Sequence, residues 1–270
     1  MERLRPAPEQ DEDHDWLRIG CDMALEGEQP LWVDPVRHFR GSAAGDPCLR
    51  QLVLGAMGHE MPIEARKRRM FNVGLLIERE AVRTARNAGF LVAPLGEDDQ
   101  PEVIYLDPPV VGHIDMICRS PSGAMVPVEV KSINGGLFRK LPKEHGPVPA
   151  GESPLLKAHA RYVRQLNTYI CAPNHDFGEG CMMFESKETH KQKFFWLRRD
   201  DEMATQMLDR LRPAAGYILS DPQRVPPRSV DPEPRGGTHK HCDRRYLCVR
   251  VPDEGADYDE VRRIDATMRG

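Results

Sequence analysis

The stretch 110-VVGHIDMICRSPSGAMVPVEVKSI-133 decides the fold. Two runs rich in apolar and β-branched residues, 110–120 and 124–133, flank the turn sequence SPSG and predict an antiparallel pair of strands. Asp115 stands in the first run, where a buried strand would otherwise carry only apolar side chains. Because an ionised carboxylate is costly to bury alone, something in the fold has to compensate for Asp115.

The second run supplies partners for this carboxyl group. Side chains alternate across a strand, so Glu129 and Lys131 project from one face and Val130 from the other. Pairing through the turn at 120–124 brings Asp115 within a few residues of lying opposite Glu129. A divalent cation would compensate for both carboxylates, with the carbonyl of Val130 as a further oxygen ligand, and Lys131 would orient an attacking water or help to deprotonate it. A salt bridge between surface strands is the alternative interpretation.

The flanking segments predict an α/β domain with three helices and five strands, plus a short helix within 46–58. We expect helices at 70–88, 155–171 and 201–219, and strands at 102–106, 110–120, 124–133, 180–187 and 191–199. A long loop is expected over 134–154. The predicted division is an acidic N-terminal arm (1–45), a core (46–220), and a Pro-rich linker with a Cys/His-containing tail that packs back on the core (221–270).

The composition leaves nucleic-acid binding open. Lys and Arg total 38 against 42 Asp and Glu, a formal net charge of −4, but the basic residues gather at 66–69, 139–143, 187–199 and 235–250. A local basic groove can coexist with an acidic metal site. The sequence has no apolar stretch near the roughly 20 residues that span a bilayer, and its polar N-terminus does not resemble a secretory signal. We therefore expect a cytoplasmic protein without membrane association.

The motif in which Asp115 is followed 14 positions later by Glu-Val-Lys resembles the PD-(D/E)XK nuclease superfamily. Its GHID form resembles the RecB-type branch. The resemblance implies a restriction-endonuclease-like core with a central mixed β-sheet flanked by helices. In that branch a later helix carries a glutamine and, four residues on, a tyrosine, which Gln165 and Tyr169 match in RYVRQLNTYI. The implied catalytic residues are Asp115, Glu129, Lys131, Gln165 and Tyr169. An ordinary amphipathic helix is the alternative for the last two.

A further acid, Glu78, falls on the wheel of the helix at 70–88 in a stripe with apolar residues that include Phe71 and Leu75. We therefore expect Glu78 to point inward, although a buried glutamate without a partner is the alternative. The resembled branch completes its metal site with an acid or histidine from this helix. The implied ligands of Mg²⁺ or Mn²⁺ are Glu78, Asp115, Glu129 and the carbonyl of Val130.

The tail sequence 237-GTHKHCDRRYLC-248 holds two of the seven cysteines. Some RecB-type nucleases, including AddB and the nuclease of CRISPR adaptation, bind an iron–sulfur cluster with one cysteine before the core and three near the C-terminus. Cys48, Cys242 and Cys248 resemble three of these ligands, and His239 stands in for the fourth. Such a set suits Zn²⁺ or a [4Fe-4S] cluster. Two packed thiols are the structural alternative.

These patterns predict a metal-dependent DNA nuclease, specifically an exonuclease that acts on DNA ends or single strands in recombination, repair or DNA processing. The alternatives are a structure- or sequence-specific endonuclease of the same fold and a non-catalytic DNA-binding subunit. DNA is the expected partner, together with a recombination, helicase or CRISPR-adaptation protein. Arg139, Lys140 and Lys143 are candidates for a wall of the DNA channel, and Phe138 for stacking on bases.

Overall fold

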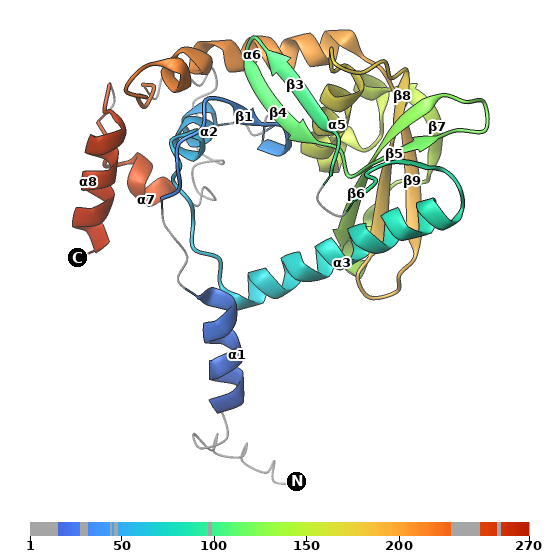
Figure 1. Ribbon diagram of the computed structural model, residues 1–270, viewed down its shortest axis with the longest axis horizontal. Coiled ribbons are helices and arrows are strands. Elements are labelled where there is room, and N and C mark those ends of the chain that lie inside the picture. Colours follow the sequence, from blue (N-terminus) through green and yellow to red (C-terminus); the bar gives the residue numbers. More distant parts are fainter. Residues whose placement is uncertain are drawn as a thin grey trace, which may run out of the picture.

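The fold is α/β, with a mixed six-stranded sheet between helices (Figure 1). The computed structural model describes residues 16–27, 32–43, 45, 48–96, 99–227, 244–252 and 255–269. In spatial order the strands are β2 (Leu91–Ala93), β5 (Met116–Arg119), β6 (Met125–Ile133), β8 (Glu179–Ser186), β9 (Gln192–Arg198) and β7 (His145–Pro149). The pairs β6/β8 and β7/β9 are parallel, whereas the other neighbours are antiparallel.

A second, three-stranded sheet has the order β1 (Phe39–Arg40), β4 (Pro109–His113) and β3 (Glu102–Leu106). The prediction of one continuous strand over 110–120 is therefore wrong, because the chain leaves the small sheet after β4 and enters the large sheet at β5. Asp115 lies at the break, and its carboxylate accepts a hydrogen bond from the Val130 backbone N–H at 2.7 Å. The β5/β6 ladder begins one residue later, at the pair Met116–Val128. The Asp115 side chain thus accepts the hydrogen bond from the Val130 N–H that the backbone of a continuing strand would have accepted.

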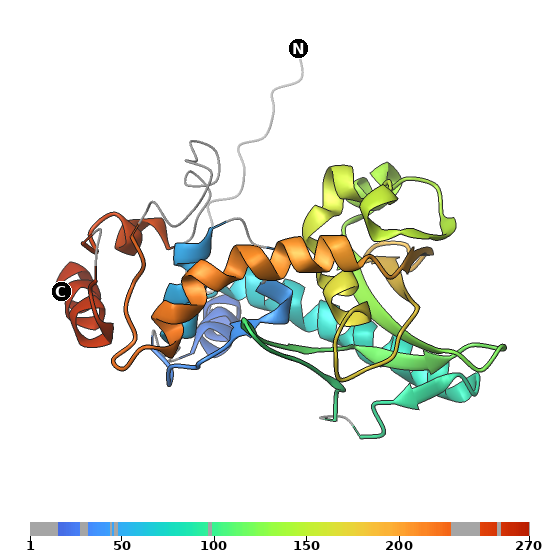
Figure 2. The ribbon, with the colours of Figure 1, turned by 90° about the horizontal axis from the view of Figure 1, so that it is seen from above.

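Helices cover both faces of the large sheet (Figure 2). On one face α3 (Ala65–Asn87) packs Ile77 and Ala81 against Val128 and Val130 of β6. The other face carries α5 (Leu156–Ile170) and α6 (Asp201–Leu219), which belong to the larger core cluster. The predicted helices at 155–171 and 201–219 are confirmed. The predicted helix at 70–88 is confirmed as α3, which begins earlier because Lys and Arg are themselves good helix formers.

The segment 134–154 is more ordered than the predicted long loop. It contains α4 (Gly135–Lys140), whose N-terminus is capped by the Asn134 side chain, then β7 and a short 3₁₀ turn (Ala150–Glu152). Phe138 of α4 is buried, and its ring lies 5.3 Å from the Lys193 ammonium. The expectation that Phe138 stacks on DNA bases is therefore wrong, because the core already holds this ring.

The remaining helices are α1 (Trp16–Glu26), α2 (Leu49–Ala56), α7 (Arg245–Cys248) and α8 (Tyr258–Arg269). Arg50 of α2 is fully buried and donates to the backbone carbonyls of Pro226, Val251 and Pro252. These charge-assisted hydrogen bonds from Arg50 tie two segments to α2, namely the chain that follows α6 and the segment that follows α7. The predicted domain boundaries stay predictions. Of the helices in the described ranges, none has the length and apolar character needed to cross a membrane.

Candidate active site

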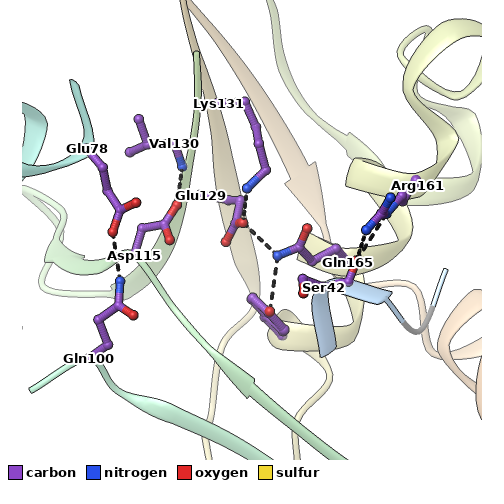
Figure 3. Close-up of polar contacts among 10 residues, drawn as sticks. Ser42, Glu78, Gln100, Asp115, Glu129, Val130, Lys131, Arg161 and Gln165 are labelled. Atoms are coloured by element: carbon purple, nitrogen blue, oxygen red, sulfur yellow. Dashed lines mark hydrogen bonds and ion pairs between the residues drawn. The ribbon is translucent and has the colours of Figure 1, made fainter. Parts of the chain in front are cut away.

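The candidate site lies where β5 and β4 separate beside β6 (Figure 3). Asp115 is half-buried as a residue, but its carboxyl group is held inside by the Val130 N–H. Burial raises the pKa of Asp115, while Lys131 and the Val130 hydrogen bond oppose that rise. The sequence located this acid correctly beside β6 but placed it within a strand, whereas the structure places it in a bend.

Glu129 is the most buried acid of the site. Its Oε1 accepts hydrogen bonds from the Lys131 ammonium and, at 2.6 Å, from the Gln165 amide of α5. Burial raises the pKa of Glu129 to about 8, and the Asp115 carboxylate adds to the rise while Lys131 opposes it. Burial alone would lower the pKa of Lys131, but the Glu129 and Asp115 carboxylates outweigh it and raise that pKa. Lys131 is therefore a cation at neutral pH, fixed beside two acids.

Gln165 connects this acid to a buried tyrosine. Its amide also donates to the Tyr169 hydroxyl at 3.1 Å, and both side chains are almost fully buried. Burial raises the pKa of Tyr169 above its ordinary value, so the phenol stays protonated. The structure encloses both side chains, with Gln165 in direct contact with Glu129.

Two glycines make room for this tyrosine. A Cβ on Gly112 would lie 2.6 Å from Cε1 and 2.9 Å from the hydroxyl of Tyr169, and a Cβ on Gly41 would lie 2.9 Å from the same ring carbon. All three distances are shorter than atoms can approach without something moving. The glycine of the GHID motif therefore permits the close packing of Tyr169 against β4.

The sequence missed the contribution of the segment around Gly41. Strand β1 pairs in parallel with β4, and the Arg161 guanidinium donates two hydrogen bonds, of 3.1 and 3.0 Å, to the Ser42 carbonyl. Residues 39–43 thus wall the site behind Tyr169. Their sequence, FRGSA, shows no periodicity, and only the pairing of β1 with a distant strand brings them there.

Glu78 approaches the site from α3, as predicted, but from the rim. Its Oε1 accepts from the Gln100 amide at 2.8 Å, and the residue is half-buried. Burial raises the pKa of Glu78 to about 7; the Asp115 carboxylate adds to this rise, whereas Lys131 and Gln100 oppose it. Glu78 also lines a hollow of about 390 Å³ with Gln100 and Asp115. The three acids are therefore electrostatic neighbours.

The donor set fits a hard cation. Glu129 Oε2 is buried and has no hydrogen-bond partner among the described residues, a costly state for a carboxylate oxygen that a cation would relieve. The acids do not all converge, however, because each is held by its own partner. Among the residues that the structure describes, no three His, Cys, Asp or Glu side chains are close enough to hold one metal ion. Whether the Val130 carbonyl binds metal stays a prediction.

The predicted cysteine site is only partly visible. Cys48 and Cys248 are buried near α2 and α7, respectively, and Cys48 caps α2 by accepting from the Gln51 N–H at 3.4 Å. His239 and Cys242 lie outside the described residues. The four-ligand set stays a prediction.

No known protein-family model matches the sequence, and no curated protein matches it. Solved structures similar to the chain include LHK-Exo in complex with dAMP, at 12% identity and a TM-score of 0.47, covering 69% of this chain and 90% of that one. The structure of SSO0001 is similar at 11% identity and a TM-score of 0.45, covering 89% of this chain and 96% of that one. Likeness at this level does not extend to function, which has to be argued from the site.

Proposed function

We propose that this protein is a metal-dependent nuclease that hydrolyses phosphodiester bonds of DNA. The observation that carries the proposal is the buried Glu129 carboxylate, which has one oxygen without a partner in the part of the chain that the structure describes and stands beside Lys131 and Asp115. Proteins avoid burying acids together unless the cluster has a use, and strongly raised pKa values mark candidate sites of chemistry.

Glu129 and Asp115 would hold Mg²⁺ or Mn²⁺, with the Val130 carbonyl as a further ligand and Glu78 joining from the rim. When bound, the cation activates water and stabilises the charge that develops on the phosphate. The Glu78 side chain accepts a hydrogen bond from the Gln100 amide and is half-buried, and a rotation of this side chain would bring its carboxylate toward Asp115. Glu78, from α3, would thus complete the metal site to which Glu129 and Asp115 contribute from the sheet.

Lys131 is the residue best placed to act on the reacting atoms. Its ammonium is charged and mostly buried, and it lies against Glu129 and 5.5 Å from the Tyr162 ring centre. From this position it would orient the attacking water and stabilise a phosphate oxygen. Gln165 is a positioning residue, because it holds Glu129 Oε1 and is itself bonded to Tyr169.

Within this class we propose an exonuclease that acts on DNA ends or single strands in recombination, repair or DNA processing. A structure- or sequence-specific endonuclease is the alternative. Arg139 and Lys140 are exposed at the end of α4, the helix that follows β6. They would contact phosphates along the DNA path. A recombination, helicase or CRISPR-adaptation partner stays a prediction.

The proposal is tested with end-labelled linear DNA and closed circular DNA, single- and double-stranded, incubated with Mg²⁺ or Mn²⁺. We expect the wild type to degrade linear DNA, and the Lys131→Ala and Asp115→Ala variants to lose cleavage by about 10²- to 10⁴-fold. Lys191→Ala, in the exposed turn between β8 and β9, is the matched control and should cleave normally. Unchanged cleavage by both site variants would reject the assigned site, and cleavage of closed circles would reject a strict exonuclease.

We also propose a structural Zn²⁺ or [4Fe-4S] cluster in the tail, held by Cys48, His239, Cys242 and Cys248. Metal analysis and absorption spectra of the purified protein test this directly. Stoichiometric zinc or iron that is lost in a Cys248→Ser variant is the expected result, and protein that contains neither metal would reject it.

A further inference from the structure

The helix α3 carries an apolar surface that the fold does not bury. Phe71 is 53% exposed and Leu75 is 52% exposed, although both belong to the stripe that the sequence assigns to the inward face. The buried face of α3 is a different one, formed by Ile77 and Ala81 against the sheet. Figure 1 shows the first half of α3 extending from α1 toward the sheet.

This exposed surface is aligned with the candidate active site. Glu78 follows Phe71 by seven positions, which is close to two whole helical turns, so both side chains leave α3 on the same side. Leu75 lies between them, three residues before Glu78. Glu78 faces Asp115, which borders the reaction centre. Phe71 lies about 10 Å from Glu78 along the helix axis, at 1.5 Å per residue.

Exposed cations stand one helical turn to either side of this apolar pair. Lys67 lies four residues before Phe71 and Arg79 four residues after Leu75, so each shares a side of α3 with its apolar neighbour, and both are exposed. The Lys187 ammonium donates to the backbone carbonyl of Met70 at 2.8 Å. An exposed aromatic ring among cations is the combination that binds single-stranded nucleic acid, because bases stack on the ring while cations contact the phosphates.

We infer that Phe71 and Leu75 form a stacking platform for unpaired bases of the DNA strand whose phosphate enters the site. This inference rests on the proposed nuclease function and narrows its substrate to DNA with a single-stranded segment at the site. Paired bases keep their faces stacked within the duplex, so the platform distinguishes a strand with free bases from an intact duplex. The platform also explains why an apolar stripe remains exposed beside a charged centre.

The test separates binding of bases from binding of phosphates. Binding of a labelled single strand and of an abasic strand of equal length is measured by fluorescence anisotropy in EDTA, so that no cleavage occurs. We expect the wild type to bind the base-bearing strand about five- to tenfold more tightly. Phe71→Ala and Phe71→Leu should lose this preference, with unchanged affinity for the abasic strand, whereas Phe71→Trp should keep it.

Phe90 provides a matched control. It is 49% exposed and lies just beyond the C-terminus of α3, where it lines an apolar hollow of about 450 Å³ with Phe194 and Trp196. Phe90→Ala should keep the wild-type preference for bases. A preference that persists in Phe71→Ala, or full retention in Phe71→Leu, would overturn the platform.

The remaining outcomes are also decisive. If Phe71→Ala lowers the molecular mass measured by analytical ultracentrifugation and leaves DNA affinity unaltered, the surface is an interface between two copies of the chain. The platform is then overturned. If the wild type cleaves DNA and Phe71→Ala still prefers the base-bearing strand over the abasic strand, the platform is rejected and the proposed nuclease function stands. A wild type that neither binds nor cleaves DNA rejects the proposed function as well.

Discussion

The two sides of the candidate site are built differently. On the β6 and α5 side, Glu129, Gln165 and Tyr169 are buried and bonded to one another, with Lys131 held against Glu129. On the α3 side, Glu78 is half-buried with one bond to Gln100, and Phe71 stands exposed two turns away. The first side is preorganised for chemistry, whereas the second can adjust to what it binds.

Asp115 joins the two sides. It borders Lys131 electrostatically on one side and Glu78 on the other, and the Val130 N–H fixes its position. The difference between the sides therefore predicts that changes on the β6 side affect the reaction most, while changes on the α3 side affect stability and binding.

The largest effect is expected from Glu129→Gln. The amide keeps the volume but removes the charge that holds Lys131 and would hold a cation, so cleavage should fall by about 10²- to 10⁴-fold. Gln165→Ala, which only loosens the hold on Glu129, should cost about 10- to 100-fold. Rates of release of labelled nucleotides measure both. Equal losses in the two variants would contradict the distinction between a ligand and its positioning residue.

The pH dependence of metal binding gives the next largest effect. Glu129 has a pKa of about 8 without metal, so below that pH a cation has to displace a proton from it. Affinity for Mg²⁺ or Mn²⁺ should therefore fall by up to about tenfold from pH 8 to pH 7, fall more steeply below pH 7, where Glu78 is protonated as well, and level off above pH 8. Isothermal titration calorimetry at several pH values measures this, with Glu129→Gln as the control that lacks the dependence between pH 7 and pH 8. Affinity that is flat between pH 6 and pH 8 would contradict the assignment.

Gly112→Ala tests the packing behind the buried side. The new Cβ would meet the Tyr169 ring at 2.6 Å, so the ring must move and Gln165 loses its support. We expect a loss of about 1 to 3 kcal/mol in the free energy of unfolding, measured by urea denaturation. Gly178→Ala is the control, because a Cβ there has no atom within 4 Å. Equal stabilities of the two variants would show that Tyr169 is not confined.

Glu78→Gln should produce the smallest effect, and it should stabilise the metal-free protein. The pKa of Glu78 is about 7 in the folded protein against an ordinary 4.5, so its contribution to stability falls as the pH rises from 4.5 to 7. Removing the charge should add about 1 to 2 kcal/mol at pH 8, after allowance for solvent screening, and nothing below pH 4.5. Urea denaturation in EDTA at both pH values measures the gain. Glu80→Gln, exposed on the same helix and paired with Arg83, should show no such gain.

Much of the site could be predicted from local sequence because its residues follow local rules. Alternation in β6 places Glu129 and Lys131 on one face, and spacing by four in α5 places Gln165 beside Tyr169. The strand break at Asp115 could not be predicted in this way. A continuous apolar run is compatible with one long strand, and the break becomes evident only from the hydrogen bond that Asp115 accepts from the Val130 N–H of another strand.

The sequence by itself determined the α/β class, the order of most elements and the pairing of acids with Lys131, because periodicity and alternation act over a few residues. Only the tertiary structure decided that residues 39–43 wall the site, that Phe138 is buried and that Phe71 is exposed. Those outcomes depend on which distant segment covers a given face. Apolar patterning shows that a side chain can be buried, but only packing in three dimensions supplies the layer that buries it.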